Sequence, residues 1–596
     1  MTRLATALLL LSTSVALAAP TQLRLVSRGG LTVPAAGTTA PTGLDTLVPS
    51  HPEIDLHAYL SGGPTADHPL PTSIPDAPSS GLSVWNSGFS GFDGLNHADQ
   101  RLAGTGVYAN TQFSLEPPDQ GLCVGNGFVV ETVNTAFAIY DRKGKVLAGP
   151  VAANQFFGLR PEIDRKTGLY GDFTSDPKCI YDWTSNRFYI TLLQLDVDPA
   201  TGGFTGPSHT LIAVSRTGNP TGAWDAYALD TTNDGTNGTP SHPGCPCFGD
   251  QPLLGFDENA IFISNNEFPV FVNGFNGAQV YGIGKDAFGG NGSVVLFDNL
   301  ALEEGIAYTV QPASTPPGGK FERSKRGTEF FASSLEFTGG LDDRIAVWAM
   351  TGTRSLNGNK PKVDFGYRVV KTLPYGSPPA GTQKEGPTPL RDSLIKLGYD
   401  EKLEELESND DRMQQAVYTD GTLWASLPTI VKPKGDTSYR AGALWFRIDT
   451  EVEDHGLRAK LKRQGYLARK GTDILFPSVA VNRAGAGVIG FSVTGPSMWP
   501  SSGYVLLDDD GTGALHVAAA GAAPEDGFTG YTAFGGNGTA RWGDYSAAVA
   551  APDGSIWIAN EYITPRPRTV NANWGTFVSR LKVKGCDDDE GHGHDD

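Results

Sequence analysis

The stretch SDPKCIYDWTSNRFYITLLQ, residues 175–194, decides the fold class of this chain. An acidic start leads into a short apolar strand, a turn rich in Asp and Asn follows, and a second strand ends in Gln. Related units begin at Phe248 (FGDQPLLGFDENAIFISNNE) and at Arg541 (RWGDYSAAVAAPDGSIWIANEY). About seven such units between Asp119 and Tyr562 predict an all-β fold. We expect a single β-propeller of about seven blades, each with four antiparallel strands, and one short helical insertion.

The composition agrees with this fold and limits the partners. The 596 residues include 75 Gly and 41 Pro but only 4 Met, which is typical of a turn-rich β protein. The formal net charge of −19 disfavours binding to DNA, RNA or an anionic membrane surface. We therefore expect no nucleic-acid partner. No apolar segment is long enough to span a bilayer, so we expect no membrane insertion. A monomer is also expected.

The N-terminus predicts export. Arg3 supplies a positive charge, residues 5–11 are apolar, and Ala16-Leu17-Ala18 is a cleavage signal. We expect a secreted protein, extracellular or periplasmic. The predicted segments are a signal peptide (1–18), a linker or arm rich in Pro, Gly and Ser (19–80), a lead-in that packs on or closes the propeller (81–118), the propeller (119–585) and an acidic His-containing tail (586–596).

Two further local features are predicted. Residues 393–409 have an amphipathic pattern and are expected to form the helical insertion. In an oxidising compartment the cysteines should pair. Cys123 with Cys179, at equivalent positions of the first two units, and Cys245 with Cys247 are the expected bridges, which leaves Cys586 unpaired.

Polar residues begin and end the hairpins of the repeat. The start of the first strand and the end of the second lie at the same end of an antiparallel hairpin, and in a propeller the first strand lines the central channel. These residues should therefore ring one mouth of the channel. They are Asp119, Asp176, Asp250, Gln311, Asp410, Asp411, Arg412, Asp473, Arg541 and Asp544 at the starts, and Asn134, Gln194, Asn266, Glu267, Asn560 and Glu561 at the ends.

Three interpretations of this ring stay open. The Asp residues can satisfy backbone N–H groups of the turns, as Asx residues do elsewhere. They can instead bind Ca²⁺, with Asp119, Asp176 and Asp250 as ligands. Finally, two carboxylates can act on a glycan as acid and base or nucleophile. The carboxylate pairs for that role are Asp544 with Glu561 and Asp250 with Glu267.

Other side chains would contact the ligand. Arg412 and Arg541 can hold an anionic group, and Trp499, expected in a loop (GPSMWPSSGY), can stack on a sugar. The remaining polar contacts would come from Gln311, Asn134, Gln194 and Asn560.

Longer stretches such as FSLEPPDQGLCVGNGFVVETVNTAFAIYDRKGKVLAGP, LFPSVAVNRAGAGVIGFSVTGP and RWGDYSAAVAAPDGSIWIANEYI resemble a group of exported bacterial β-propeller proteins of largely uncharacterised function. The resemblance implies the fold and export but brings no catalytic residues. Three functions follow as hypotheses: binding of a glycan or protein ligand at the acidic channel mouth, glycan cleavage at the same mouth, and a surface or matrix scaffold without a small-molecule site.

Overall fold

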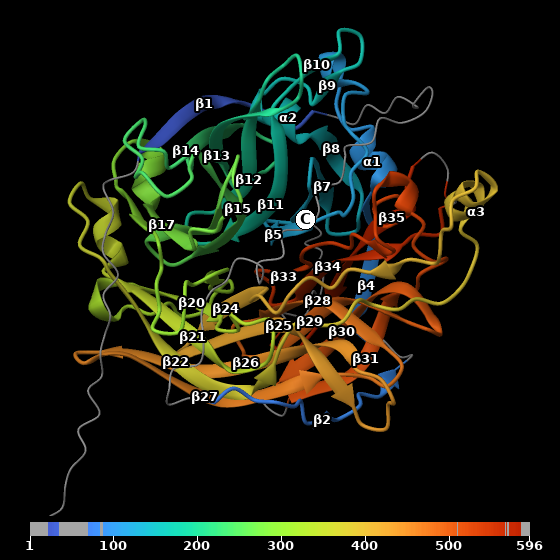
Figure 1. The fold of residues 1–596 in the computed structure, drawn as a ribbon. Coiled ribbons are helices and arrows are strands. Elements are labelled where there is room, and N and C mark those ends of the chain that lie inside the picture. The colour runs from blue at the N-terminus through green and yellow to red at the C-terminus, as the bar shows by residue number, and fades with distance from the viewer. Residues whose placement is uncertain are drawn as a thin grey trace, which may run out of the picture.

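The computed structural model describes residues 22–34, 69–83, 87–508, 511–566, 568 and 571–585. The expected signal peptide, most of the expected arm and the acidic tail with Cys586 lie outside these residues. Strands make up most of the regular structure (Figure 1), and the helices α1 (His97–Arg101), α2 (Ala153–Phe157) and α3 (Pro389–Lys396) are short. The described part of the chain is therefore all-β. None of its helices has the length and apolar character needed to cross a bilayer.

The strands follow one another as antiparallel meanders of four. The first half of the chain contains β5 (Gly121–Gly125), β6 (Phe128–Val133), β7 (Ala136–Asp141) and β8 (Val146–Ala152), then β11 (Phe173–Asp182), β12 (Arg187–Val197), β13 (Phe204–Ser215) and β14 (Trp224–Asp230), then β15 (Cys247–Phe256), β16 (Ala260–Pro269), β17 (Ala278–Gly284) and β18 (Val294–Phe297). In each group, every strand pairs with the next one along the chain.

The second half repeats the pattern. It contains β19 (Gln311–Ser314), β20 (Thr328–Ser334), β21 (Asp342–Thr351) and β22 (Asp364–Tyr375), then β24 (Gln415–Thr419), β25 (Thr422–Pro433), β26 (Arg440–Glu453) and β27 (Gly456–Leu467), then β28 (Asp473–Val481), β29 (Gly487–Gly495), β30 (Met498–Asp508) and β31 (Gly511–Ala519), and finally β33 (Ala547–Ala550), β34 (Ile556–Ile563) and β35 (Trp574–Leu581). Short two-residue pairs, β9 (Ile163–Asp164) with β10 (Leu169–Tyr170) and β23 (Glu405–Leu406) with β32 (Thr539–Ala540), connect loops between them.

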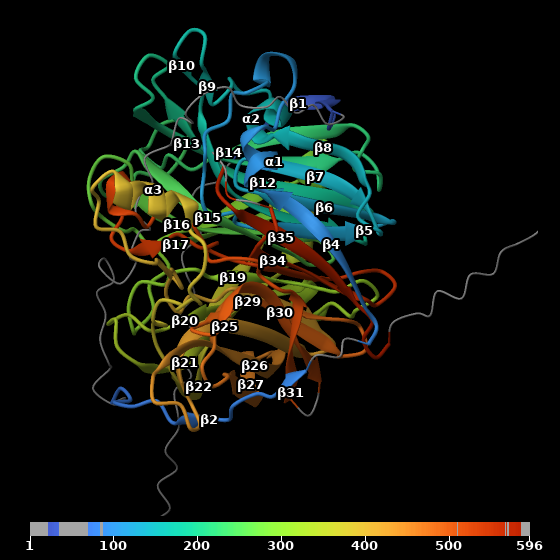
Figure 2. The same ribbon diagram turned by 90° about the vertical axis from the view of Figure 1, so that its right-hand side faces the viewer.

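Segments before the repeats complete several sheets. Strand β4 (Phe89–Asn96) pairs antiparallel with β35 and gives the last sheet its fourth strand, and Figures 1 and 2 show blue β4 beside red β35. Strand β1 (Leu23–Leu31) adds a fifth strand to the second sheet by pairing with β14. Strands β2 (Asp76–Ala77) and β3 (Leu82–Ser83) pair with β25 and β31. Two segments of the expected arm, β1 and β2, thus pair with strands of the repeats.

The apolar core lies between neighbouring sheets, because most of these strands are apolar on both faces. Tyr189, Ile212 and Tyr227 of the second sheet pack with Ile263 and Tyr281 of the third in one buried cluster. The strand tryptophans are part of this core: Trp348, Trp424, Trp445 and Trp557 are all at most 3% exposed. Burial of this kind is the main stabilising contribution to the fold.

The predicted helix over residues 393–409 is wrong in extent. Helix α3 begins four residues earlier, with Pro389 at its first position, where the missing N–H costs nothing. It ends at Lys396, since Gly398 takes a φ of +97°. After the helix, the buried Glu401 fixes the chain, because its carboxylate accepts hydrogen bonds from the backbone N–H groups of Thr532 and Ala533. Both expected disulfides, Cys123–Cys179 and Cys245–Cys247, are present.

Candidate functional site

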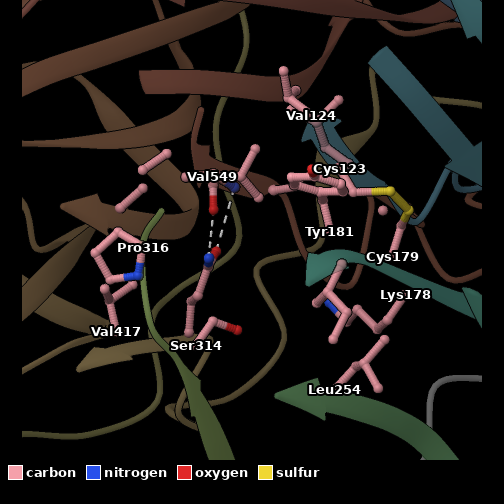
Figure 3. Close-up of a pocket in the computed structure, with 18 of the residues that line it drawn as sticks. Cys123, Val124, Lys178, Cys179, Tyr181, Leu254, Ser314, Pro316, Val417 and Val549 are labelled. Atoms are coloured by element: carbon pink, nitrogen blue, oxygen red, sulfur yellow. Dashed lines mark hydrogen bonds between the residues drawn. A yellow bond between two sulfur atoms is a disulfide. The ribbon is translucent and has the colours of Figure 1, made fainter. Parts of the chain in front are cut away.

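The first strands of the meanders line a narrow central cavity. Residues of β5, β11, β15, β19, β24, β28 and β33 surround about 90 Å³ of space. Figure 3 shows this cavity with the Cys123–Cys179 disulfide on one side. The side-chain amide of Gln415, which lines the cavity, donates to the backbone C=O of Ala548 and accepts from its N–H. This volume suits a few water molecules rather than a ligand.

Lys178 is an unusual group in this cavity. Its ammonium lies 2.9 Å from the centre of the Tyr545 ring, a cation–π contact. Burial lowers the pKa of Lys178 to about 7, against the opposing effect of Asp119, Asp176 and Asp544. The lysine lines the central cavity, and three of the carboxylates predicted at the mouth act on its charge.

At that mouth, several of the predicted Asp residues join neighbouring sheets. Asp119 accepts a 2.7 Å hydrogen bond from the backbone N–H of Asp544, and Asp176 accepts one of 3.1 Å from that of Gln251. Asp473 accepts a 3.2 Å bond from the N–H of Ala441. The donors belong to other repeats rather than to the turns beside each Asp. These carboxylates thus have a structural role between sheets.

A bulge with a positive φ recurs where the first strands begin. Asp176, Gln251 and Phe476 have φ values of 58°, 48° and 52°, each precedes a proline, and the pairing register shifts at each. Bulges re-aim side chains and are frequent beside functional sites. Here the bulge at Asp176 turns its carboxylate toward the third sheet.

The two predicted arginines are already neutralised by carboxylates. Arg412, only 1% exposed, forms a bidentate ion pair with Asp410, with N–O distances of 2.7 and 2.8 Å. Arg541 contacts both oxygens of Asp544, at 3.2 and 3.1 Å, and lies 3.3 Å from Glu407. Of the two, only Arg541 lines a pocket, and its charge is shared between two acids.

The other predicted polar residues form hydrogen bonds with neighbouring groups of the protein. Asn134 accepts from Ser175 and from the N–H of Asp176, so it ties the first sheet to the second. Gln194 contacts His209 and Asp196. Gln311 donates to the carbonyl of its neighbour Pro312, and Asn560 donates to Ser502 and Gly503.

Two of the predicted catalytic carboxylates are buried away from any described pocket. Glu561, 2% exposed, accepts a 2.8 Å bond from the N–H of Gly543, and burial raises its pKa well above the usual range. Glu267 is fully buried and is bound by Asn233 and His242. Trp499 is the second residue of strand β30 rather than part of a loop, and the Lys384 ammonium lies 4.2 Å from its ring centre.

A larger pocket of about 470 Å³ opens beside the channel mouth, over the second and third sheets, and is called the mouth pocket here. Its polar side chains are Ser175, Asp176, Asp250, Asn273, Arg541 and Asp544. Its walls are apolar: Phe173, Leu193, Leu195, Phe204, Phe248, Phe268, Pro269, Val270, Phe271 and Val272. The structure thus gathers three predicted carboxylates and one predicted arginine in one ligand-sized space.

Two acids of this region, Asp119 and Asp544, have raised pKa values. Burial raises the pKa of Asp544, although Arg541 opposes the shift. Burial, together with the nearby Asp544 and Asp176, raises the pKa of Asp119 well above its usual range. Crowded carboxylates resist ionising together.

The described residues bring together one group of three potential metal ligands within 4.8 Å: Cys245, Cys247 and Glu267. The two sulfurs are joined as a disulfide, so neither can act as a thiolate ligand. Binding of calcium by Asp119, Asp176 and Asp250 stays a prediction.

Sequence reasoning missed the aromatic wall of the mouth pocket. The loop after β16 carries Phe271 and Val272, which are 58% and 55% exposed. It is held by a bond from the N–H of Val270 to the carbonyl of Pro246, within the Cys245–Cys247 bridge. The signal in the sequence was FPVFVNGFNG (268–277), a run of phenylalanines in a turn-forming segment.

Comparison with known proteins gives only remote likenesses. No family model and no curated protein matches this chain. Among solved structures, a Hadza microbial sialidase is 10% identical with a TM-score of 0.33, covering 97% of this chain and 96% of its own. A polysaccharide lyase, PL25 ulvan lyase, is 11% identical with a TM-score of 0.29, covering 77% and 94%. An arabinanase from Penicillium chrysogenum is 9% identical with a TM-score of 0.25, covering 68% and 92%. TM-scores of this size carry neither fold nor function over to this chain.

Proposed function

We propose that this chain is an exported β-propeller of about seven blades that binds a glycan in the mouth pocket. The propeller arrangement is supported by the successive four-strand meanders, by the shared cavity along their first strands, and by strand β4, which joins the last sheet to the N-terminal segment. The two disulfides support an oxidising compartment.

The observation that carries the proposal is the composition of the mouth pocket. A sugar ring has apolar C–H faces and a rim of hydroxyl groups, so it needs apolar walls and hydrogen-bonding groups together. Phe248, Phe268 and Phe271 supply such walls, and Asp176 and Asp250 supply acceptors.

The charge of the pocket defines the kind of glycan. Asp176, Asp250 and Asp544 line it with Arg541, which already contacts Asp544 and Glu407. An anionic group would face net negative charge. The fitting ligand is therefore neutral or amino-bearing.

Glycan cleavage is the second function that a specific observation favours. Asp544 has a raised pKa and lines the same pocket as Asp250. A protonated and an ionised carboxyl flanking a glycosidic bond are the requirement of a hydrolase. Glu561 and Glu267 are not among the residues that line the pocket, so we assign the hydrolase role to Asp544 and Asp250 within this proposal.

The test is a glycan array followed by a polysaccharide-digestion screen. Wild type is compared with Asp250→Asn and Phe271→Ala, and with the exposed controls Asp364→Asn and Phe534→Ala outside the pocket. The proposal expects binding to neutral or amino sugars that both pocket variants weaken about tenfold. Released sugar that Asp544→Asn abolishes would identify a hydrolase. If no glycan binds, the proposal fails. Loss of binding after calcium removal with EGTA would support the predicted calcium.

A further inference from the structure

A second large cavity lies at the opposite end of the second sheet from the mouth pocket, and we call it the rim cavity. It has a volume of about 700 Å³. Arg187 stands at the start of β12, whereas Leu193 and Leu195 of the mouth pocket stand near the end of that strand. The two cavities are therefore separate sites.

The rim cavity is cationic in a chain of net charge −19. Its charged lining residues are Arg28, Arg187, Arg216, Lys285, Asp225 and Asp286. They come from β1, β12, the end of β13, the start of β14 and the short 3-10 helix of residues 285–289. Four basic side chains thus face two acidic ones.

Two of the four cations are paired with carboxylates. The Arg216 Nε atom lies 3.0 Å from Asp225, and the Lys285 ammonium lies 2.9 Å from Asp182. Arg28 and Arg187 make no ion pair with any carboxylate in the described ranges. Arg187 is held only by a long 3.4 Å bond to the carbonyl of Ser215. Two guanidinium groups are left with donors for an anion.

Strand β1 arranges this site. The N–H of Gly29 donates to Asp225 at 2.5 Å, and Asp225 in turn holds Arg216. A Cβ at Gly29 would lie 2.5 Å from the Arg216 Cζ atom, so a side chain there would displace the guanidinium. Gly29 also has a φ of +63°, which favours glycine. Arg28, Arg187 and Arg216 all line the rim cavity, so the three guanidinium-bearing side chains border one space.

We propose that the rim cavity binds the sulfate or phosphate group of a small ligand. The planar guanidinium fork matches the oxygen atoms of an oxyanion and forms paired, charge-assisted hydrogen bonds with them. Arg28 and Arg187 would hold the anion, and Arg216 and Lys285 would add to the field. The volume leaves room for a sugar-sized remainder beside the side chains of Asn291 and Phe288.

The experiment is isothermal titration of the full chain with inorganic sulfate, inorganic phosphate, and a sulfated disaccharide beside its unsulfated parent. Arg28→Gln and Arg187→Gln are compared with Arg24→Gln, which lies on the same strand but not in the cavity. We expect saturable binding of the sulfated disaccharide and of at least one inorganic anion. Each cavity variant should weaken it about tenfold or more, and the control less than about twofold.

Each possible result either supports or contradicts anion binding in the rim cavity. Tighter binding of phosphate than sulfate assigns a phosphate ester, and the reverse assigns a sulfate ester. Absence of binding at about 10 mM ligand, or equal affinity of wild type and both variants, overturns the proposal. Because Arg28 is exposed, Arg28→Gln should leave the melting temperature unchanged, so a loss of binding there cannot come from unfolding. Phe271→Ala should leave anion binding intact, which separates this site from the mouth pocket.

Discussion

His242 provides the sharpest test of the electrostatics beside the mouth pocket. Its Nδ1 atom lies 2.8 Å from Glu267 and its Nε2 atom 3.0 Å from Asp298, and its side chain is only 6% exposed. Burial by itself lowers the pKa of His242. The hydrogen bonds to Asp298 and Glu267 outweigh that effect and raise the pKa to about 9. The imidazolium therefore links Glu267 on β16, the strand that precedes the Phe271 loop, to Asp298 in the segment after β18.

The size of the effect follows from the pKa change. An ordinary histidine has a pKa of about 6.5, so a pKa of about 9 in the folded protein corresponds to about 3 kcal/mol of stabilisation. The folded pKa is raised, so the folded state binds the proton more tightly than the unfolded chain does. This stabilisation is complete below about pH 6.5 and is lost as the pH rises through about 9.

The assay is urea unfolding of wild type and His242→Gln at about pH 6 and about pH 9.5. The substitution should lower the free energy of unfolding by about 3 kcal/mol more at the lower pH than at the higher one. His455→Gln, an exposed histidine, is the matched control and should show no such difference. An equal loss of unfolding free energy at both pH values would refute the assignment of a bridging imidazolium.

Two further predictions concern the frame of the mouth. Arg412→Ala removes the bidentate guanidinium partner of the buried Asp410, so it should lower the free energy of unfolding by about 3–5 kcal/mol while the folded protein keeps its glycan affinity. Loss of glycan affinity in correctly folded protein would show that Arg412 takes part in binding. Replacing Cys123 and Cys179 together by Ala opens a loop of sequence separation 56 and should cost about 4 kcal/mol in urea unfolding, and an unchanged midpoint would contradict this.

Many residues of the mouth could be predicted from the sequence, because local hairpin geometry determines which strand ends lie together. The starts of first strands meet at one end, and this brings Asp176, Asp250, Asp544 and Arg541 into one pocket. The hydrogen bonds that join different repeats, from the N–H of Gln251 to Asp176 and from the N–H of Asp544 to Asp119, could not be predicted. Asp119 and the N–H of Asp544 are 425 residues apart in the chain.

Other features depended on tertiary context. The amphipathic pattern of residues 393–409 predicted a helix that the positive φ of Gly398 and the hydrogen bonds of the buried Glu401 interrupt. The periodicity of the sequence shows neither feature. Strand β1 lies in a segment whose Pro, Gly and Ser content favours a flexible arm, and only the free edge of β14 makes it a strand. The apolar walls of the mouth pocket come from three separate hairpins, so no single stretch shows them together.

The most direct test of the central claim is titration of one oligosaccharide into wild type, Phe271→Ala and Phe534→Ala. The oligosaccharide is the strongest neutral or amino-bearing binder from the array. The account predicts saturable binding that Phe271→Ala weakens about tenfold and Phe534→Ala leaves unchanged. Equal affinity in all three proteins, or no binding by wild type, would contradict a glycan site in the mouth pocket.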